Sequence, residues 1–366
     1  SRSVAQTETE EWSLFPRQRE GNIYAHNWSL CEDGVVPEGD AYRNARLPII
    51  TTEMRAKINE GKIEQTKPQY FGNYKVNESG DDMSHEIFSE LFSAQQQYLS
   101  SGINLFVEDA ILGSHSQMRN GVRITTSIPA VALIARSLLI PSSPMEVNHR
   151  ARFKGWNFDP RWKSSVPVWN GQSYDLPKDL PPVAQPGQRP IVAFVGGDHA
   201  ILAVQFVENN SEIVGANIVV GSEVPVRGLI EGVGHAACVL ANTQQPTAVT
   251  LPCTAIAKGK DTAIVIGGSD EVVAAAAQAG TLYGAYHNTL SPEGVAAIWG
   301  GYISPSAANA KASQQGSTVT PIVVVEGKAA VANHPNNLAY PAKHIVFYEK
   351  GASKGKLSTE EALTRL

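Results

Sequence analysis

The sequence has few cysteines and no long apolar run. Its three cysteines, Cys31, Cys238 and Cys253, form no CxxC pair, so no disulfide framework is expected and a reducing compartment is indicated. The most apolar stretch, residues 128–140, is interrupted by Arg136 and is shorter than the roughly 20 residues that a bilayer requires. The sequence therefore predicts no transmembrane segment.

The sequence also lacks an excess of basic residues. The 366 residues include 30 Lys and Arg against 35 Asp and Glu, a formal net charge of −5. Proteins that bind a phosphate backbone usually carry an excess of positive charge, so no nucleic-acid partner is expected. With 42% hydrophobic and 18% charged residues, the composition excludes fibrous and globally disordered classes and allows one or two globular domains.

The first residues carry no readable targeting segment. The chain starts at Ser1 rather than Met, so either a targeting peptide has been removed or the chain is trimmed. Residues 1–48 are polar, carry Trp12 and Trp28 and show no sustained periodicity, which predicts an extended N-terminal arm. Residues 170–190 hold five prolines and two glycines, which predicts a surface insertion.

Hydrophobic spacing predicts a mixed α/β fold. Helices are expected at 84–100 and at 130–139, the second opened by Pro129, whose missing N–H costs nothing in a first turn. An alanine-rich helix is expected at 270–279, with Ser269 as its cap. Apolar and β-branched runs predict strands at 104–111, 121–127, 191–195, 200–207, 213–220, 247–251, 263–267, 322–325 and 344–348.

A strand, a glycine turn and a helix in succession have the layout of a phosphate-binding loop. Residues 263–276 read AIVIGGSDEVVAAA, and residues 281–303 read TLYGAYHNTLSPEGVAAIWGGYI. These segments resemble the kinase-type loop, GLSGTGKTT, and the metal-binding segment, GDDEHGW, of ATP-dependent phosphoenolpyruvate carboxykinases. Upstream, LFVEDAILGSHSQMRNGVRITTS at 105–127 resembles the family's LFVVDAFCG…TR.SVR.IT stretch.

Weaker matches follow in the family's order, at 159–163, 218–232, 252–255 and 343–362. The resemblance covers roughly residues 51–362 and depends on the ordered series, not on any single motif. It implies a carboxykinase-like N-terminal domain at 49–245, which contains the 170–190 insertion, and a truncated P-loop-type nucleotide-binding-like domain at 246–366.

The family's reaction requires a lysine at the phosphates, metal ions and cationic clamps. The resemblance places the phosphate-loop lysine at Val273 and the hydroxyl residue after it at Ala274. It places the paired aspartates at Ala285 and Tyr286. Valine offers no charge and alanine offers no metal ligand, so this part of the family's machinery is degenerate.

The metal and substrate positions are replaced as well. The resemblance places the lysine pair at Ile230 and Glu231, the metal histidine at Pro252 and the substrate-side tyrosine at Pro225. Glu231 can ligate a metal, but its expected histidine partner is missing. The nearest counterpart of the carboxylate clamp, Thr66-Lys67-Pro68, offers lysine instead of a bidentate guanidinium. Together these losses predict no catalysis, no cofactor and no metal site.

Other chemistry-bearing groups receive structural interpretations. Residues 196–199, Gly-Gly-Asp-His, predict a turn between strands, and His287 without a second ligand predicts a structural histidine. Cys238 with His235 lacks the orienting third group that a nucleophile needs. The basic and aromatic run at 153–163 has the composition of a single-strand stacking surface, but the family resemblance explains it as scaffold.

We therefore expect a pseudoenzyme that serves as a structural or accessory subunit of a large organellar complex, with other protein subunits as partners. The expected location is the mitochondrial matrix side, peripheral to a respiratory-chain assembly. One alternative is a non-catalytic regulator that binds a nucleotide or a dicarboxylate through a cation such as Lys67 or Arg227. Lesser alternatives are a subunit of the mitochondrial ribosome and a divergent active carboxykinase. Activity would need a replacement phosphate lysine, and only Lys258 and Lys260 are close in sequence.

Overall fold

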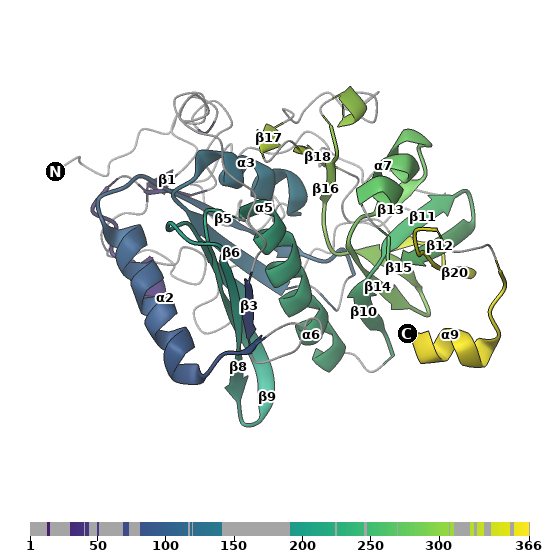
Figure 1. Cartoon of the computed structure of the whole chain (residues 1–366), viewed down its shortest axis with the longest axis horizontal. Helices are drawn as coiled ribbons and strands as arrows, with labels where there is room; N and C mark the ends of the chain where they lie inside the picture. The colour runs from purple at the N-terminus through teal and green to yellow at the C-terminus, as the bar shows by residue number, and fades with distance from the viewer. Residues whose placement is uncertain are drawn as a thin grey trace.

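The described chain is a mixed α/β protein with several sheets and few helices (Figure 1). The predictions for Trp12, Trp28, Lys67 and residues 153–163 and 170–190 lie outside the described residues. The computed structural model describes residues 13–14, 30–39, 41–43, 50, 69–72, 81–115, 118, 120–140, 191–223, 225–244, 247–268, 270–306, 308–310, 323–325, 328–332, 338–351 and 355–365.

One nine-stranded mixed sheet contains all the described strands before residue 221. Its order is β1-β2-β5-β6-β7-β9-β8-β3-β4. Strands β6, β7 and β9 are parallel neighbours, and antiparallel strands flank this group on both sides. The bounds are Ser13–Leu14 (β1), Ala41–Arg43 (β2), Gln69–Gly72 (β3), Asp81–Asp82 (β4), Leu105–Leu112 (β5), Asn120–Thr126 (β6), Ile191–Val195 (β7), Ile201–Asn209 (β8) and Glu212–Val220 (β9).

Helices cover both faces of this sheet. On one face, α2 (His85–Ser100) buries Phe88 and Leu99, and the side chain of Ser84 caps it by accepting a hydrogen bond from the N–H of Ile87 at 3.3 Å. Figure 1 shows α2 across the sheet from the other helices. These have the bounds Pro129–Leu138 (α3), Pro225–Gly228 (α5), Leu229–Val233 (η5, a π-helical turn) and Gly234–Gln244 (α6).

Three smaller sheets contain the described strands after residue 247. Their orders are β10-β14-β15-β19, β13-β11-β12-β20 and β16-β18-β17. The helices α7 (Asp270–Gln278) and α9 (Thr359–Arg365) accompany them. The strand bounds are Val249–Pro252 (β10), Thr254–Lys258 (β11), Asp261–Ile266 (β12), Leu282–Gly284 (β13), His287–Ser291 (β14), Gly294–Ala297 (β15), Gly301–Ser304 (β16), Val323–Val325 (β17), Lys328–Ala332 (β18), Leu338–Ala339 (β19) and His344–Phe347 (β20).

One hydrophobic core joins the large sheet to the later part of the chain. The β16-β18-β17 sheet packs against α3. Ile298, Trp299 and Ile303 belong to the same buried cluster as Ile134 of α3 and Val204 of β8. The change from one set of sheets to the other near residue 245 therefore does not separate the hydrophobic core.

Most predicted elements are confirmed within two residues. The helices predicted at 84–100, 130–139 and 270–279 are α2, α3 and α7. As expected, Pro129 opens α3. Among the described helices, none combines the length and the apolarity needed to cross a membrane, in agreement with the sequence. Strand β11 was not predicted because its TAIAK sequence contains alanine, which is a weak strand former.

The predicted N-terminal arm folds in part against the large sheet. Leu30 and Val35 are buried with Leu105 of β5, and Ala41 of β2 lies in the same cluster. The turn η2 (Leu30–Asp33) precedes this strand. The expectation of an extended arm therefore does not hold for residues 30–39 and 41–43, whose isolated apolar residues gave no periodic signal.

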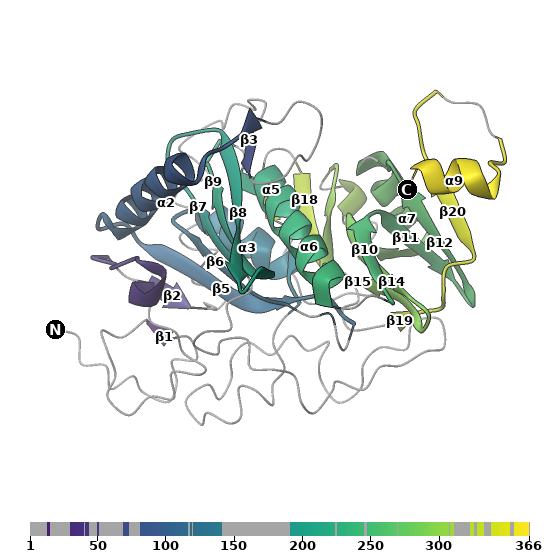
Figure 2. The same cartoon turned by 90° about the horizontal axis from the view of Figure 1, so that it is seen from below.

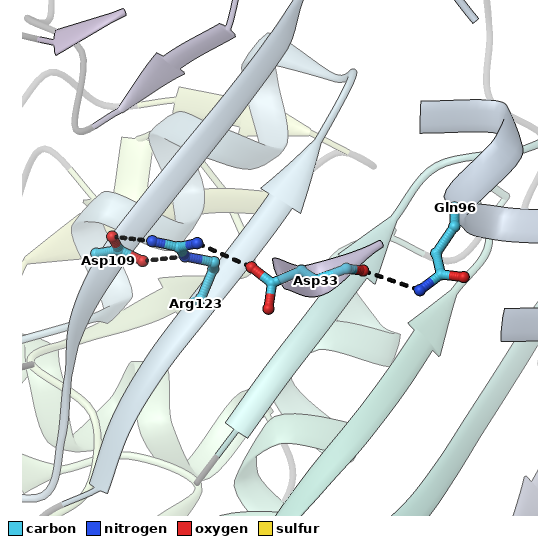
Figure 3. A network of polar contacts seen from close by, with 4 residues as sticks. All are labelled: Asp33, Gln96, Asp109 and Arg123. Carbon is cyan, nitrogen blue, oxygen red and sulfur yellow. Dashed lines mark hydrogen bonds and ion pairs between the residues drawn. The ribbon is translucent and has the colours of Figure 1, made fainter. Parts of the chain in front are cut away.

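Arg123 is fully buried and joins this segment to the sheet (Figure 3). Its Nε and Nη2 donate to the two carboxylate oxygens of Asp109, at 2.7 and 2.9 Å, and its Nη1 donates to Asp33 Oδ2 at 2.8 Å. The backbone carbonyl of Asp33 accepts a hydrogen bond from Gln96 Nε2 of α2 at 2.8 Å. One guanidinium thus connects η2 and two central strands, and Asp33 extends the connection to α2.

Replacement of Arg123 by methionine leaves Asp33 and Asp109 buried without their counter-charge. Removal of one partner from a buried ion pair costs about 3–5 kcal/mol, and we expect a loss of this size in the free energy of unfolding, measured in urea. The matched control is Arg227→Met, which breaks an exposed pair worth less than about 1 kcal/mol. Equal losses in the two variants would contradict this account of Arg123.

Candidate functional site

The loop between β12 and α7 occupies the position that the resemblance gives to the phosphate loop. Gly267 has a φ of +77°, a conformation that favours glycine. A Cβ atom at Gly267 would lie 2.6 Å from the carbonyl oxygen of Tyr348. A glycine is therefore required here because of chain packing, in a turn that leads from a strand directly into a helix.

The first turn of α7 is acidic, and the chain's own lysines pair with it. Asp270 Oδ2 lies 2.6 Å from Lys328 Nζ, and Glu271 Oε1 lies 3.4 Å from Lys350 Nζ. Carboxylates at a helix N-terminus interact favourably with its partial positive charge. They also repel an anion at the same position, so this turn is poorly suited to hold a triphosphate.

Three of the four positions assigned to the phosphate loop and the aspartate pair meet in one apolar cluster. Val273 is 2% exposed and Ala285 is fully buried, and the partly buried Tyr286 packs against the cluster that contains them. Ala274 is buried on the same helix. We call this group the α7 cluster, and its buried members are Val273, Ala276, Leu282, Ala285, Tyr302, Ala310, Ala329 and Val331. The structure therefore brings these positions together, and it fills the space between them with apolar side chains.

Tyr286 links the α7 cluster to the central core. Its hydroxyl accepts a hydrogen bond from the N–H of Ile303 at 2.7 Å and donates to the carbonyl of the same residue at 3.1 Å. Burial, with a smaller contribution from Asp270, raises the pKa of the Tyr286 phenol. Its φ is +66°, which is uncommon for a side chain of this size. Tyr286 is thus held neutral in a structural role.

The positions assigned to the metal lysines and the substrate tyrosine lie on the α5–η5–α6 stretch. Pro225 opens α5 and is buried. Ile230 packs against the central core. Glu231 Oε1 accepts a hydrogen bond from Arg227 Nε at 2.7 Å in an exposed pair. Arg227, the cation proposed for a ligand-binding regulator, therefore interacts with a carboxylate of its own helical stretch.

Pro252, the position assigned to the metal histidine, faces His287 across the β10–β14 pair. His287 is buried, and its Nδ1 accepts a hydrogen bond from Trp299 Nε1 at 3.2 Å. A Cβ atom at Gly234 would lie 2.3 Å from Cε1 of the His287 ring, so only glycine allows this approach. Burial, with a further contribution from His235, lowers the pKa of His287 to about 3. His287 is therefore a neutral core residue, as the sequence indicated.

Residues 196–199 form the predicted turn, between β7 and β8. Gly197 has a φ of +74°. His199 Nδ1 accepts the N–H of Ile201 at 3.3 Å, so its Nε2 carries the proton and donates to Gln95 Oε1 at 3.2 Å. Burial lowers the pKa of His199. The turn is thus fixed by α2 and by its own backbone.

The cysteine and histidine pair on α6 has no features of a nucleophile. Cys238 and Cys253 are free thiols and both are buried. Burial raises the pKa of the Cys238 thiol and raises that of Cys253 to about 12, whereas burial lowers the pKa of His235 to about 4. A reactive cysteine needs a lowered pKa and exposure, so these groups interact as neutral core side chains.

Lys258 and Lys260, considered as a replacement for the phosphate lysine, lie at the β11–β12 hairpin. Both side chains are exposed. In the register of the hairpin, Lys258 lies opposite Asp261, the first residue of β12. Gly267 follows the other end of β12. The length of one strand therefore separates these lysines from the loop. Residues 66–68, the nearest clamp counterpart, lie outside the described residues.

Sequence reasoning missed one buried carboxylate. Glu108 of β5 is 3% exposed, and its Oε2 lies 3.5 Å from Arg136 Nη1 of α3. Burial raises its pKa to about 7, although the nearby Arg136 lowers it. The signal in the sequence was a glutamate within the apolar run of a central strand, where charged residues are rare.

No protein-family model matches the chain, and a search of curated proteins finds no match either. The resemblance to carboxykinases therefore stays a prediction based on the quoted motifs. In the parts of the chain that the structure describes, no three His, Cys, Asp or Glu side chains are grouped so that they could hold a metal ion.

Introduction of a lysine at Val273 would place a charge in the α7 cluster. An uncompensated buried charge costs about 3–5 kcal/mol, so Val273→Lys should lower the free energy of unfolding by about this amount in urea denaturation. Ala275→Lys on the exposed face of the same helix is the matched control, with an expected change below about 0.5 kcal/mol. A stable Val273→Lys variant would show that the position is open to solvent.

The buried histidines predict a loss of stability in acid. The unfolded chain protonates His287 near its ordinary pKa of 6.5, whereas the folded chain does so only near 3. Protonation therefore favours the unfolded state, and the stability falls as the pH drops from about 6.5 towards 3, by up to about 1.4 kcal/mol per pH unit.

The variant His287→Gln, with an amide that can still accept from Trp299, should flatten this dependence. The pKa of Glu108 is raised in the folded chain, so protonation of Glu108 favours the folded state instead. The test therefore compares the variant with the unmodified chain over the same pH range. Parallel curves for the two proteins would mean that His287 is accessible to protons in the folded state.

Proposed function

We propose that this chain is a catalytically inactive carboxykinase-like protein that serves as a structural subunit of a large organellar complex, a mitochondrial respiratory-chain assembly. The observation that carries the proposal is the α7 cluster. The resemblance assigns three positions in this region to a lysine and two aspartates, and valine, alanine and tyrosine belong there to one apolar cluster. A site with this lining supports packing and not phosphoryl transfer.

The remaining assigned positions support the same proposal. Glu231 is paired with Arg227, and Pro252 faces the buried His287. Glu231 and Pro252 thus each interact with another residue of the same chain, which supports a structural role and not substrate binding. The second part of the proposal, a subunit role on the matrix side, rests on the sequence, in which tryptophans in a polar N-terminal segment are typical of interface anchors.

The absence of catalysis is tested directly with the purified full chain. Titration calorimetry with ATP and manganese should give no heat of binding, because two carboxylates occupy the start of α7 and the lysines beside them, Lys328 and Lys350, are paired with those carboxylates. Oxaloacetate, ATP and manganese should release carbon dioxide no faster than the protein-free mixture. Binding without turnover would support a regulator instead, and turnover would support an active carboxykinase.

The subunit role is tested on the endogenous protein. Gentle detergent extraction, native separation and mass spectrometry should place it in a very large complex together with respiratory-chain subunits. Comigration with ribosomal proteins would support the alternative of a mitochondrial ribosome. Migration as a small particle would contradict the proposed function.

A further inference from the structure

Strand β20 forms the outer edge of the sheet β13-β11-β12-β20. It pairs in parallel with β12, and no described strand pairs with its other side. Figures 1 and 2 both show β20 next to β12, at the end of the molecule remote from α2. Among the residues that the structure describes, the strand therefore has one edge without a paired strand.

The side chains of this strand are unusually exposed for their type. Ile345 and Val346 are each 45% exposed, and Tyr348 directly after the strand is 36% exposed. Ile345 and Val346 are successive residues, so they point to opposite faces of the sheet. Apolar side chains are thus accessible on both faces of the edge.

Strand β20 is only four residues long, but within it there is no proline, bulge, lysine or carboxylate. Natural edge strands carry prolines, bulges or charged side chains that block addition of a strand. The sequence of β20 is His-Ile-Val-Phe. Its register with β12 continues without a shift from the His344 pair to the Phe347 pair. This edge is regular and open.

Backbone groups at the edge are available for hydrogen bonds. The N–H of Tyr348 donates to the carbonyl of Ile266 at 2.8 Å, in register with the Ile266–Phe347 pair, which directs Tyr348 towards β12. Backbone direction alternates along a strand, so the N–H and C=O groups of Ile345 and Phe347 point to the open side. A strand added there would satisfy them.

We propose that two copies of this chain pair through β20, antiparallel, about a twofold axis at Val346. In this register Val346 lies opposite itself, and Ile345 lies opposite Phe347 of the second copy. Lys343, whose Nζ also lies 2.7 Å from Asp261 Oδ1 of its own chain, lies opposite Glu349 of the second copy, so the exposed ends of the two segments carry complementary charge. The pairing is isologous, as in most dimers.

Charge also disfavours a neighbouring register. A shift of one residue in one direction would place Lys343 opposite Lys350 of the second copy, and like charges directly opposite each other destabilise a strand pair. A shift in the other direction places Lys343 opposite Tyr348, so charge favours the proposed register over one of its two neighbours. This proposal does not depend on the proposed function, because it uses no residue of the α7 cluster.

The first test is the mass of the purified full chain in sedimentation experiments over a range of concentrations. The expected result is a dimer at high concentration. Val346→Lys places two ammonium groups opposite each other, and it should weaken the dimer by at least about tenfold. Val214→Lys is the matched control, because Val214 has the same exposed fraction of 45% but lies in the β8–β9 hairpin of the other, nine-stranded sheet. It should leave the dimer unchanged.

The second test is the register. Val346→Cys should form an intermolecular disulfide in mild oxidant, because opposed residues of paired strands have the Cα separation that a disulfide needs. Val214→Cys should stay uncrosslinked under the same conditions. A monomer at every concentration overturns the proposal, as does a dimer that persists in Val346→Lys. A monomer that accepts only a strand from another protein also overturns self-pairing, and none of these results bears on the proposed function.

Discussion

The buried guanidinium of Arg123 is the interaction on which the large sheet depends. A charge without water is stable only if its hydrogen-bonding groups meet partners in good geometry. Arg123 and Asp109 face each other across the β5–β6 pair, and a slip of one residue would turn them to opposite faces of the sheet. The ion pair therefore fixes the register of the two strands. Asp33 of η2 completes the pair from outside the sheet, and its backbone carbonyl extends the connection to Gln96, so η2 and α2 are tied to the same guanidinium.

The region assigned to catalysis follows the opposite principle. Charged groups near the start of α7 pair with lysines at the surface, whereas Val273 and Ala285 below them are buried among apolar side chains. Active sites usually keep groups that cost stability, because desolvated charge is what their chemistry uses. Here the side chains contribute to packing, and the hydrogen bonds of Tyr286 close the gap between the α7 cluster and the central core. This arrangement supports the proposal of a pseudoenzyme because it stabilises the fold where an enzyme would sacrifice stability.

The elements could be predicted from the sequence because their signals are local. The helical spacing in 84–100 and the β-branched run at 121–127 were sufficient, and Pro129 marked the start of α3. The contacts could not be predicted, because they join distant residues: Asp33 is 90 positions from Arg123. In the same way, residue types alone showed that Val273 and Ala285 lack catalytic groups, but they did not show that both belong to one cluster.

The sheet β13-β11-β12-β20 borders the α7 cluster. It buries small residues on its inner strand β11 and exposes large residues on its edge strand β20. Strand β11 buries Ala255 and Ala257, which lets neighbouring layers approach closely. Strand β20, on the other side of β12, exposes Ile345 and Val346. These side chains add little to the stability of a single chain because they stay in contact with water. Burial of apolar area contributes about 25 cal/mol per Å², and at this edge that contribution becomes available only when another strand covers it. The stability of the inner strands therefore comes from folding, whereas the apolar character of β20 contributes through association.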